Sequence, residues 1–446
     1  MTHDLTTGKP LRDIWQFAVP VLFGLLLQQV YSLVDTAIVG HALGVMALGG
    51  VGATGSVNFL VIGFCGGLCT GMAIPLAQAF GAGDYRQLRR YVAGCVWLGI
   101  AMSALLLALT LPTTQALLKL MGTPEEQMGY AYDYIFIIFI GIPATILYNM
   151  GACVLRSLGD SKSPVWFLAI ASVINIVLDL LTVCVLGMGV AGAGVATVIS
   201  QGVSVALCIL YVFRSARLLL PEKKHFHVES RLYWELFSQS ISMGLMSSIV
   251  SAGSVVLQYG INGLGTLTIA GHTAARKLFA FTDMPLISMA NAGSTFVSQN
   301  RGANQPDRVR RGMRQMYLYS VVVMVAAVVL MNFGAQWMVQ LISGSSEPIV
   351  LENGARYLLW NAPFYAVLGV LLCTRYALQS LGQKVLPLFS SVIELVGKVI
   401  FVLVFIPRYA YNAVILCEPI IWCFMAAYLV AVYRRDAFVY PRKKTI

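Results

Sequence analysis

The stretch that decides the fold is QAFGAGDYRQLRR at residues 78–90, because it returns as QNRGANQPDRVRR at residues 299–311. Gln, Gly, Ala and two Arg occupy the same places in both copies, at an offset of 221 residues (299 − 78). A second pair, LRSLGDSKSP at 155–164 and LQSLGQKVLP at 378–387, aligns at an offset of 223 residues (378 − 155). The chain is therefore predicted to consist of two homologous halves.

Apolar segments long enough to cross a membrane fill both halves. Of the 446 residues, 58% are hydrophobic and 11% are charged, which is outside the range of soluble proteins, and a spanning helix needs roughly 20 apolar residues. We predict an all-α polytopic membrane protein with twelve transmembrane helices. The predicted windows are 14–39, 51–80, 92–111, 135–155, 165–186 and 190–213, then 236–261, 269–296, 316–342, 357–378, 385–406 and 410–433.

The domain organisation follows from the repeat. Each half holds an even number of helices, so both halves enter the membrane in the same direction and are expected to be related by a pseudo-twofold axis along the membrane normal. We predict an N-lobe at residues 1–213, a cytoplasmic linker at 214–231 and a C-lobe at 232–446; the linker is charged and contains Pro221. Substrate sites of such proteins are expected between the lobes.

The net charge of +11 reflects membrane orientation rather than nucleic-acid binding. If the predicted helices cross in turn, the basic clusters fall on one side, and the opposite loops carry only Lys119, Arg356 and Arg408. The positive-inside rule then places both termini in the cytoplasm of a multi-pass protein of the cell membrane. The clusters lie at Lys9 and Arg12, Arg86 to Arg90, Arg156 and Lys162, Arg214 to Arg231, Arg301 to Arg314, Arg375 and Lys384, and Arg434 to Lys444.

Acidic residues inside apolar windows are the candidate functional residues of the first half. Placing a carboxylate in the hydrocarbon region costs about 3 kcal/mol, so such a residue is expected to have an ion-pair partner, contact with water or a function. Asp179 and Thr197 are expected at one depth, Asn175 lies one turn from Asp179, and Asp35 lies in the outer part of the first window. These oxygens suit a proton or an alkali cation such as Na⁺. Alternatively, Asn175 and Thr197 only hydrogen-bond to backbone or to each other.

The second half does not repeat this pattern. Glu394 and Lys398 are an i, i+4 pair that we interpret as an internal salt bridge rather than a second ion site. Asp283 could pair with Arg276 or Lys277, or line the central cavity. Glu418 sits near a helix end, where it is expected to reach water.

The residues resemble the multidrug and toxic compound extrusion (MATE) family of transporters, specifically the DinF-like branch. The resemblance covers nearly the whole chain and rests on the two repeats, on the Q-x-x-G-A segments and on the motif beginning at Leu155. Pro20 resembles the family's kink-forming proline, and Asn175, Asp179 and Thr197 resemble its N-lobe cation site. Tyr134 falls where a cavity tyrosine is expected. The acids of a related C-lobe cation site are absent here.

The resemblance implies export of organic cations or amphipathic compounds by a monomer, in exchange for H⁺ or Na⁺ and without a cofactor, through a V-shaped cavity that alternates between faces. We hypothesise that the coupling ion and the substrate compete for the acids of the N-lobe, while the first helix bends at Pro20. The substrate cavity would include Tyr134, Asp283, Glu394 and Lys398.

Two other functions compete with this one. A lipid or lipid-linked oligosaccharide flippase of the same superfamily would line its cavity with basic residues for pyrophosphate, and Arg276, Lys277, Arg375 and Lys398 are the candidates. An enzyme is not predicted, because the sequence contains none of the metalloprotease, P-loop or nucleophile-elbow motifs in a suitable context.

Overall fold

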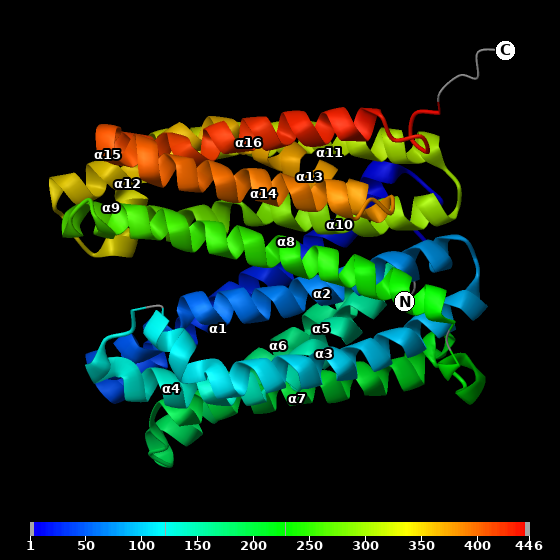
Figure 1. Ribbon diagram of the computed structural model, residues 1–446, viewed down its shortest axis with the longest axis horizontal. Coiled ribbons are helices and arrows are strands. Elements are labelled where there is room, and N and C mark those ends of the chain that lie inside the picture. Colours follow the sequence, from blue (N-terminus) through cyan, green and yellow to red (C-terminus); the bar gives the residue numbers. More distant parts are fainter. Residues whose placement is uncertain (1–3, 121, 228, 442–446) are drawn as a thin grey trace. The chain divides into compact units, whose positions relative to one another are not determined.

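The computed structural model describes residues 4–120, 122–227 and 229–441, and within these residues all regular structure is helical. Arg442 to Lys444, the end of the last basic cluster, lie outside the described residues. The α-helices, labelled in Figure 1, are α1 (Pro10–Ala53), α2 (Gly55–Gly81), α3 (Tyr85–Leu120), α4 (Glu125–Ile140), α5 (Ile142–Ser157), α6 (Lys162–Asp179), α7 (Gly189–Ser215), α8 (Ser230–Asn262), α9 (Thr266–Thr282), α10 (Met284–Gly302), α11 (Pro306–Ser343), α12 (Pro348–Asn361), α13 (Tyr365–Ser380), α14 (Val385–Ile400), α15 (Ile406–Tyr409) and α16 (Tyr411–Arg434). The shorter segments are η1 (Leu180–Val185), η2 (Arg217–Leu219), η3 (Lys223–Phe226), η4 (Ala362–Phe364) and η5 (Phe401–Phe405).

The helices account for the predicted spans. Among the described residues, 10 helices are long and apolar enough to cross a membrane, and α4 with α5, bent by 50°, makes an eleventh span. The remaining predicted window falls on α9 and α10, which meet at Asp283 and carry Arg276 and Lys277. The twelve-helix fold is therefore confirmed, with two of its spans broken.

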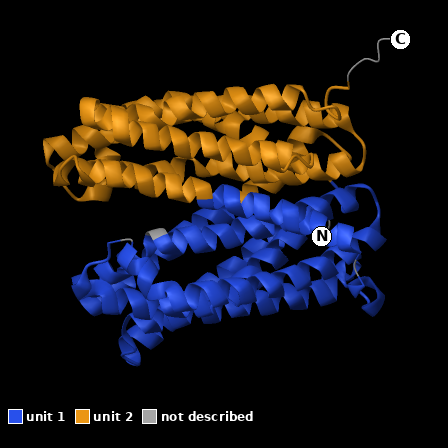
Figure 2. Cartoon of the chain, in the orientation of Figure 1, with its two compact units in different colours: residues 1–4, 23–248 blue, residues 5–22, 249–446 orange. Residues whose placement is uncertain are grey.

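The chain separates into two compact units, coloured in Figure 2. Unit 1 contains residues 23–248 and unit 2 contains residues 5–22 and 249–446. α1 thus begins in unit 2 and continues in unit 1, and α8 begins in unit 1 and continues in unit 2. The unit boundaries fall inside these two helices, because a long helix can pack at its two ends on different bundles. The predicted lobes and linker, which divide the chain at residues 213 and 232, stay a prediction.

Each half contains a π-helical segment at a matching place. α6 ends at Asp179 and runs into η1, and α14 ends at Ile400 and runs into η5. A π-helix is rare and occurs frequently at functional sites. Hydrophobic periodicity does not reveal it, so nothing in the sequence indicated it.

The N-terminal segment is held firmly in unit 2. The Arg308 guanidinium donates to the carbonyls of Leu5, Thr7 and Gly8 and pairs with the Asp13 carboxylate (2.6 Å). Gln299 Oε1 accepts from the Leu5 amide (2.9 Å), and Leu5 is fully buried. The start of α1 is therefore tied to unit 2 by the repeated segment that revealed the two halves.

Small residues set the close packing inside unit 1. A Cβ on Gly67 would lie 2.6 Å from the Met243 carbonyl of α8, and one on Gly71 would lie 2.6 Å from the Gln239 carbonyl. Two glycines four residues apart let the backbones of membrane helices approach closely. The α2 and α8 backbones accordingly touch along this edge.

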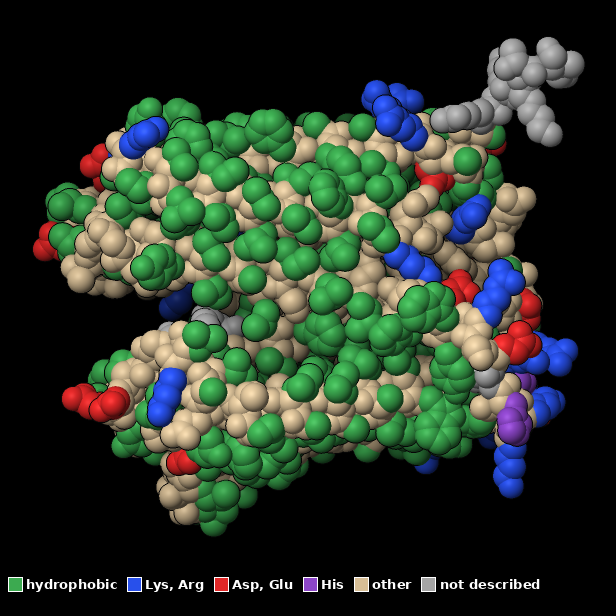
Figure 3. All heavy atoms as spheres, in the orientation of Figure 1, with side chains coloured by type: hydrophobic (Ala, Val, Ile, Leu, Met, Phe, Trp, Pro, Cys, Tyr) green, Lys and Arg blue, Asp and Glu red, His purple; other side chains and the backbone are tan. Residues whose placement is uncertain are grey.

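Charged side chains gather at the ends of the helices. Figure 3 shows apolar side chains over the sides of each unit, and Lys and Arg concentrated at one end of each. This separation agrees with the predicted basic side of the membrane. The cytoplasmic orientation itself stays a prediction.

Candidate cation site

Asp35 of α1 and Asp179 at the end of α6 come together inside unit 1. Asp35 is 9% exposed and Asp179 is fully buried, and their carboxyl groups interact directly. Asp35 Oδ1 and both oxygens of Asp179 have no hydrogen-bond donor among the described residues. Two adjacent carboxyl groups without donors repel each other unless a proton or a cation lies between them.

Asn175 and Thr197 line a small cavity of about 80 Å³, and neither Asp35 nor Asp179 is among the residues that line it. Both polar atoms of the Asn175 side chain are buried without a partner in the described part of the chain. The Thr197 hydroxyl donates to the Ala193 carbonyl (3.0 Å) and retains its lone pairs for a ligand. The alternative that both side chains hydrogen-bond to backbone is thus confirmed for Thr197, whose hydroxyl proton goes to a backbone carbonyl. It is wrong for Asn175, whose side chain forms no such bond among the described residues. The cavity wall also includes the polar side chains of Gln28, Tyr31, Thr145, Asn149, Ser172, Ser200, Gln201 and Ser204, together with the apolar side chains of Ile62, Leu168 and Ala171.

Two tyrosines lie close to the acids. Tyr134 of α4, the predicted cavity tyrosine, is buried and interacts electrostatically with Asp35 and Asp179. Tyr31 also interacts with both acids and lines the cavity. It was missed in the sequence, although it precedes Asp35 by one helical turn and so faces the same way.

The donor set fits a hard cation or a proton. No three His, Cys, Asp or Glu side chains among the described residues are grouped to hold a metal ion. The oxygens of the predicted set are carboxylate, amide and hydroxyl oxygens, the type of ligand that hard cations take. Asp35, Asn175, Asp179 and Thr197 are therefore the residues that could hold Na⁺, and the two acids could hold H⁺.

Pro20 lies within a continuous stretch of α1. It removes one helical hydrogen bond, and it lies close to the boundary between the units at Phe23. The departure from helical geometry in α1 is elsewhere, at Gly44 with φ 82° and ψ −178°. Bending at Pro20 stays a prediction.

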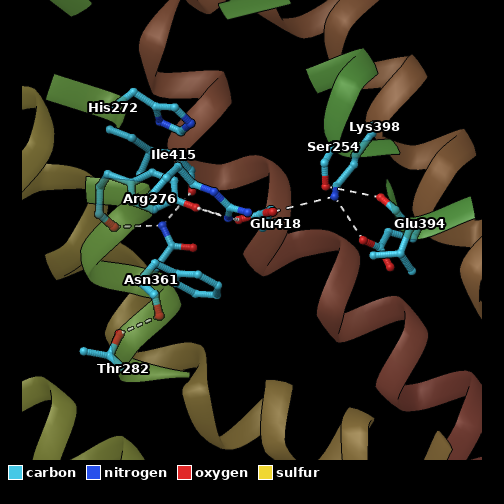
Figure 4. A network of polar contacts seen from close by, with 12 residues as sticks. Ser254, His272, Arg276, Thr282, Asn361, Glu394, Lys398, Ile415 and Glu418 are labelled. Atoms are coloured by element: carbon cyan, nitrogen blue, oxygen red, sulfur yellow. Dashed lines mark hydrogen bonds and ion pairs between the residues drawn. The ribbon is translucent and has the colours of Figure 1, made fainter. Parts of the chain in front are cut away.

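The equivalent region of unit 2 is filled by ion pairs (Figure 4). Lys398 Nζ lies 3.0 Å from a Glu394 oxygen and 3.7 Å from a Glu418 oxygen. Glu418 also accepts from Arg276 (2.8 Å) and from the Tyr357 hydroxyl (2.5 Å), and Arg375 lies 3.7 Å from Glu394. The predicted Glu394–Lys398 salt bridge is confirmed.

The expectation that Glu418 reaches water is wrong. The Glu418 side chain is 5% exposed and paired with Arg276 and Lys398. Its position early in α16 suggested a helix end, but packing against α9 and α14 encloses it. Asp283, at the junction of α9 and α10, is partly exposed and interacts electrostatically with Arg276.

Asp160, in the repeated motif before α6, has a structural task. Its carboxylate accepts from the Ser163 amide (3.0 Å), the Ser163 hydroxyl (2.7 Å) and the Tyr211 hydroxyl (2.8 Å). Burial alone would raise the pKa of Asp160, but these hydrogen bonds lower it below its usual 3.8. The motif therefore fixes the start of α6, the helix that carries Asn175 and Asp179.

We expect Asp160→Ala to lower the free energy of unfolding by about 2 kcal/mol, because the Ser163 amide at the start of α6 and the Tyr211 hydroxyl lose their acceptor. The folded-state pKa is depressed, so this contribution is present at neutral pH and disappears as the pH falls below 3.8 through that pKa. Thermal unfolding of the purified protein between pH 7 and pH 3 measures the difference. The control is Asp84→Ala, which removes a single exposed cap bond to Gln87; an equal loss in both variants would contradict the prediction.

The comparisons with known proteins agree with the repeat. The family model MatE matches residues 20–181 and 243–404, two stretches offset by 223 residues (243 − 20), as in the sequence repeat. The chain is 29% identical over 372 residues to the "Probable multidrug resistance protein YpnP" of Bacillus subtilis, covering 82% of each. It is 26% identical over 366 residues to the "DNA damage-inducible protein F" of Escherichia coli, covering 80% of the chain and 78% of that protein.

Solved structures confirm the fold. A structure described as the "outward-facing conformation of a multidrug resistance MATE family transporter of the MOP superfamily" superposes with a TM-score of 0.90 at 21% identity, covering 98% of both chains. A bundle of membrane helices built from an internal repeat is the plan of many secondary transporters, the class of protein that this fold indicates. Within that class, the chain belongs to the MatE family of multidrug transporters.

Proposed function

We propose that the protein is a secondary active multidrug exporter that moves cationic or amphipathic organic compounds out of the cell in exchange for H⁺ or Na⁺ by alternating access. Family membership and the names of the relatives support multidrug export. The proposal places a monomer in the cell membrane with both termini in the cytoplasm.

The observation that carries the coupling is the pair of buried acids in unit 1. Asp35 and Asp179 face each other without hydrogen-bond donors among the described residues. In a membrane interior such a pair is costly as two free anions, so binding of a cation is strongly favoured. Asn175, one helical turn from Asp179, and Thr197, which lines the same cavity as Asn175, are the further oxygen ligands of the proposal.

The exchange follows from competition for these acids. When they are ionised and free, they attract a cationic substrate; when H⁺ or Na⁺ neutralises them, that attraction falls. Coupling requires that each ligand prefer a different conformation. Pro20, next to the unit boundary inside α1, is the proposed point at which this helix bends.

The flippase alternative receives less support. Arg375 and Lys398, two of its candidate pyrophosphate ligands, are buried and paired with Glu394 or Glu418. A side chain already engaged by a carboxylate would have to break that pair to hold pyrophosphate.

The test is efflux of a fluorescent organic cation from proteoliposomes containing the native protein, with a sodium gradient or a proton gradient imposed in separate runs. We expect one gradient to accelerate efflux, and this acceleration to disappear when an ionophore dissipates that gradient. Efflux that ignores both gradients would contradict an exchanger. Transport of a labelled lipid without any dye efflux would favour the flippase.

A further inference from the structure

A groove between α14 and α16, which lie side by side in unit 2 (Figure 1), has no part in the cation site or in the ion pairs. Its volume is about 790 Å³, and side chains of η5 and α15 complete its wall. The wall is apolar along most of its length and includes Phe389, Val396, Phe401, Leu416 and Phe424. Such a wall gains free energy by covering a long hydrocarbon chain.

The groove opens on the outside of the helix bundle of unit 2. Its wall residues Val396 and Phe424 are 50% and 67% exposed. The same two helices hold Glu394, Lys398 and Glu418 buried and paired on their inner side. In a membrane helix bundle the charged residues face the interior, and the apolar outer face contacts lipid. The occupant of the groove therefore comes from the bilayer.

The length of the groove matches one leaflet of a bilayer. Asn412 and Phe424, both in its wall, lie 12 residues apart in α16 (424 − 412), which is about 18 Å along the helix. The hydrocarbon core is about 30 Å thick, so one leaflet spans about 15 Å. The rings of Phe401, Phe405 and Tyr409 follow one another along the wall, with centroids 4.8 Å and 6.5 Å apart. This row of rings leads to the end of the groove at Tyr409.

Positive charge gathers at that end of the groove. Arg408, next to Tyr409, is exposed and makes no hydrogen bond or ion pair within the described chain. Arg356 of α12 donates from Nη2 to Asn412 (2.6 Å), which leaves its Nε and Nη1 without an acceptor among the described residues. These arginines are two of the three basic residues that the sequence places on the side of the membrane opposite the basic clusters; the third is Lys119.

Two further observations mark this end as a binding position. Ala410, between α15 and α16, has φ 46° and ψ −130°, a conformation that residues other than glycine rarely adopt and that is found where a ligand is held. Glu352, the acid one helical turn before Arg356, forms no ion pair with it among the described residues. The two guanidinium groups thus remain available to an anion.

We propose that the groove binds an anionic phospholipid, with an acyl chain between α14 and α16 and the headgroup phosphate on Arg408 and Arg356. Guanidinium groups bind phosphate oxygens through charge-assisted hydrogen bonds, and basic pockets between membrane helices bind anionic headgroups. Tyr409 is of the residue type that lies at the headgroup level. The lipid is a partner of unit 2 whatever compound the protein exports.

Two photo-activatable lipids test the proposal in phosphatidylcholine proteoliposomes of the full chain. One is a phosphatidylglycerol and the other a phosphatidylcholine, each with the same diazirine-bearing acyl chain. Peptide mapping by mass spectrometry gives the labelling of residues 389–424 by each probe. We expect the ratio of phosphatidylglycerol to phosphatidylcholine labelling to lie well above one. Arg408→Gln should lower this ratio about fivefold, the effect of one cation beside an anionic lipid, and Arg356→Gln by a similar factor.

Matched variants separate the two contacts of the lipid. Lys119→Gln removes the exposed third cation of that side and should leave the ratio at its native value. Leu416→Trp fills the groove and should lower labelling by both probes severalfold. Leu403→Trp adds the same ring at an exposed position of η5 outside the groove and should keep the native labelling. Because Arg408 is exposed and unpaired within the described chain, Arg408→Gln should unfold at the native temperature in detergent.

Four results would overturn the proposal. Equal labelling by the two probes in the native protein would reveal only ordinary contact with the bilayer. A ratio unchanged in both arginine variants would remove the headgroup site. Loss of phosphatidylglycerol labelling on addition of inorganic phosphate would assign the arginines to the free anion. Absence of labelling, together with a chemically cross-linked dimer through α14 or α16, would show that a second copy of the chain covers the groove.

Discussion

Asp179→Asn is expected to abolish gradient-driven export without destabilising the protein. Replacing one of the paired acids removes a ligand charge of the proposed cation site, so the coupling free energy is lost and export falls about 100-fold. The same holds for Asp35→Asn. Because Asp179 has no hydrogen-bond donor among the described residues, its neutralisation removes repulsion with Asp35, and the free energy of unfolding stays the same or rises by about 1 kcal/mol.

Dye efflux under an imposed gradient measures the predicted loss of export, and thermal unfolding in detergent measures the predicted stability. The control is Asp84→Asn, an exposed acid of the same unit outside the membrane spans, which should keep full export. Full export by both Asp35→Asn and Asp179→Asn would remove unit 1 as the coupling site. A large loss of stability would instead show that the acids hold the fold.

Lys398→Met, in contrast to Asp179→Asn, should destabilise the protein strongly. Lys398 is 2% exposed and contacts both Glu394 and Glu418. Among the described residues, removing it leaves Glu394 a single ion pair, the 3.7 Å contact to Arg375. Breaking a buried ion pair from one side costs about 3 kcal/mol or more. We expect the thermal unfolding midpoint in detergent to fall by several degrees.

The double variant Lys398→Met with Glu394→Gln should recover only part of that loss, because it removes the orphaned Glu394 charge but leaves the buried Arg375 guanidinium without its carboxylate. Lys277→Met is the control for stability, since Lys277 is exposed. If Lys398→Met unfolds at the native temperature, the ion pairs of unit 2 do not stabilise it. The contrast between the two units would then need another explanation.

The sequence by itself determined the features that depend on residues close together in the chain or on the repeat, namely the spans, the two halves and the residue pairs on one helix face. Window length predicted the spans, and the echo of residues 78–90 at 299–311 predicted the two halves. The spacing of Asn175 and Asp179, and of Glu394 and Lys398, placed each pair on one helix face. These predictions depend on distances of a few residues along one helix, which the geometry of that helix fixes.

The tertiary structure alone decided which charges meet. Hydropathy says that a residue is in the membrane but not which way it faces, because the direction depends on how distant helices pack. Asp35 and Asp179 lie 144 residues apart (179 − 35), and only the packing of unit 1 joins them. Likewise Glu418 is buried because α9 and α14 bring Arg276 and Lys398 to it, and α1 and α8 pass between units because their two ends pack on different bundles.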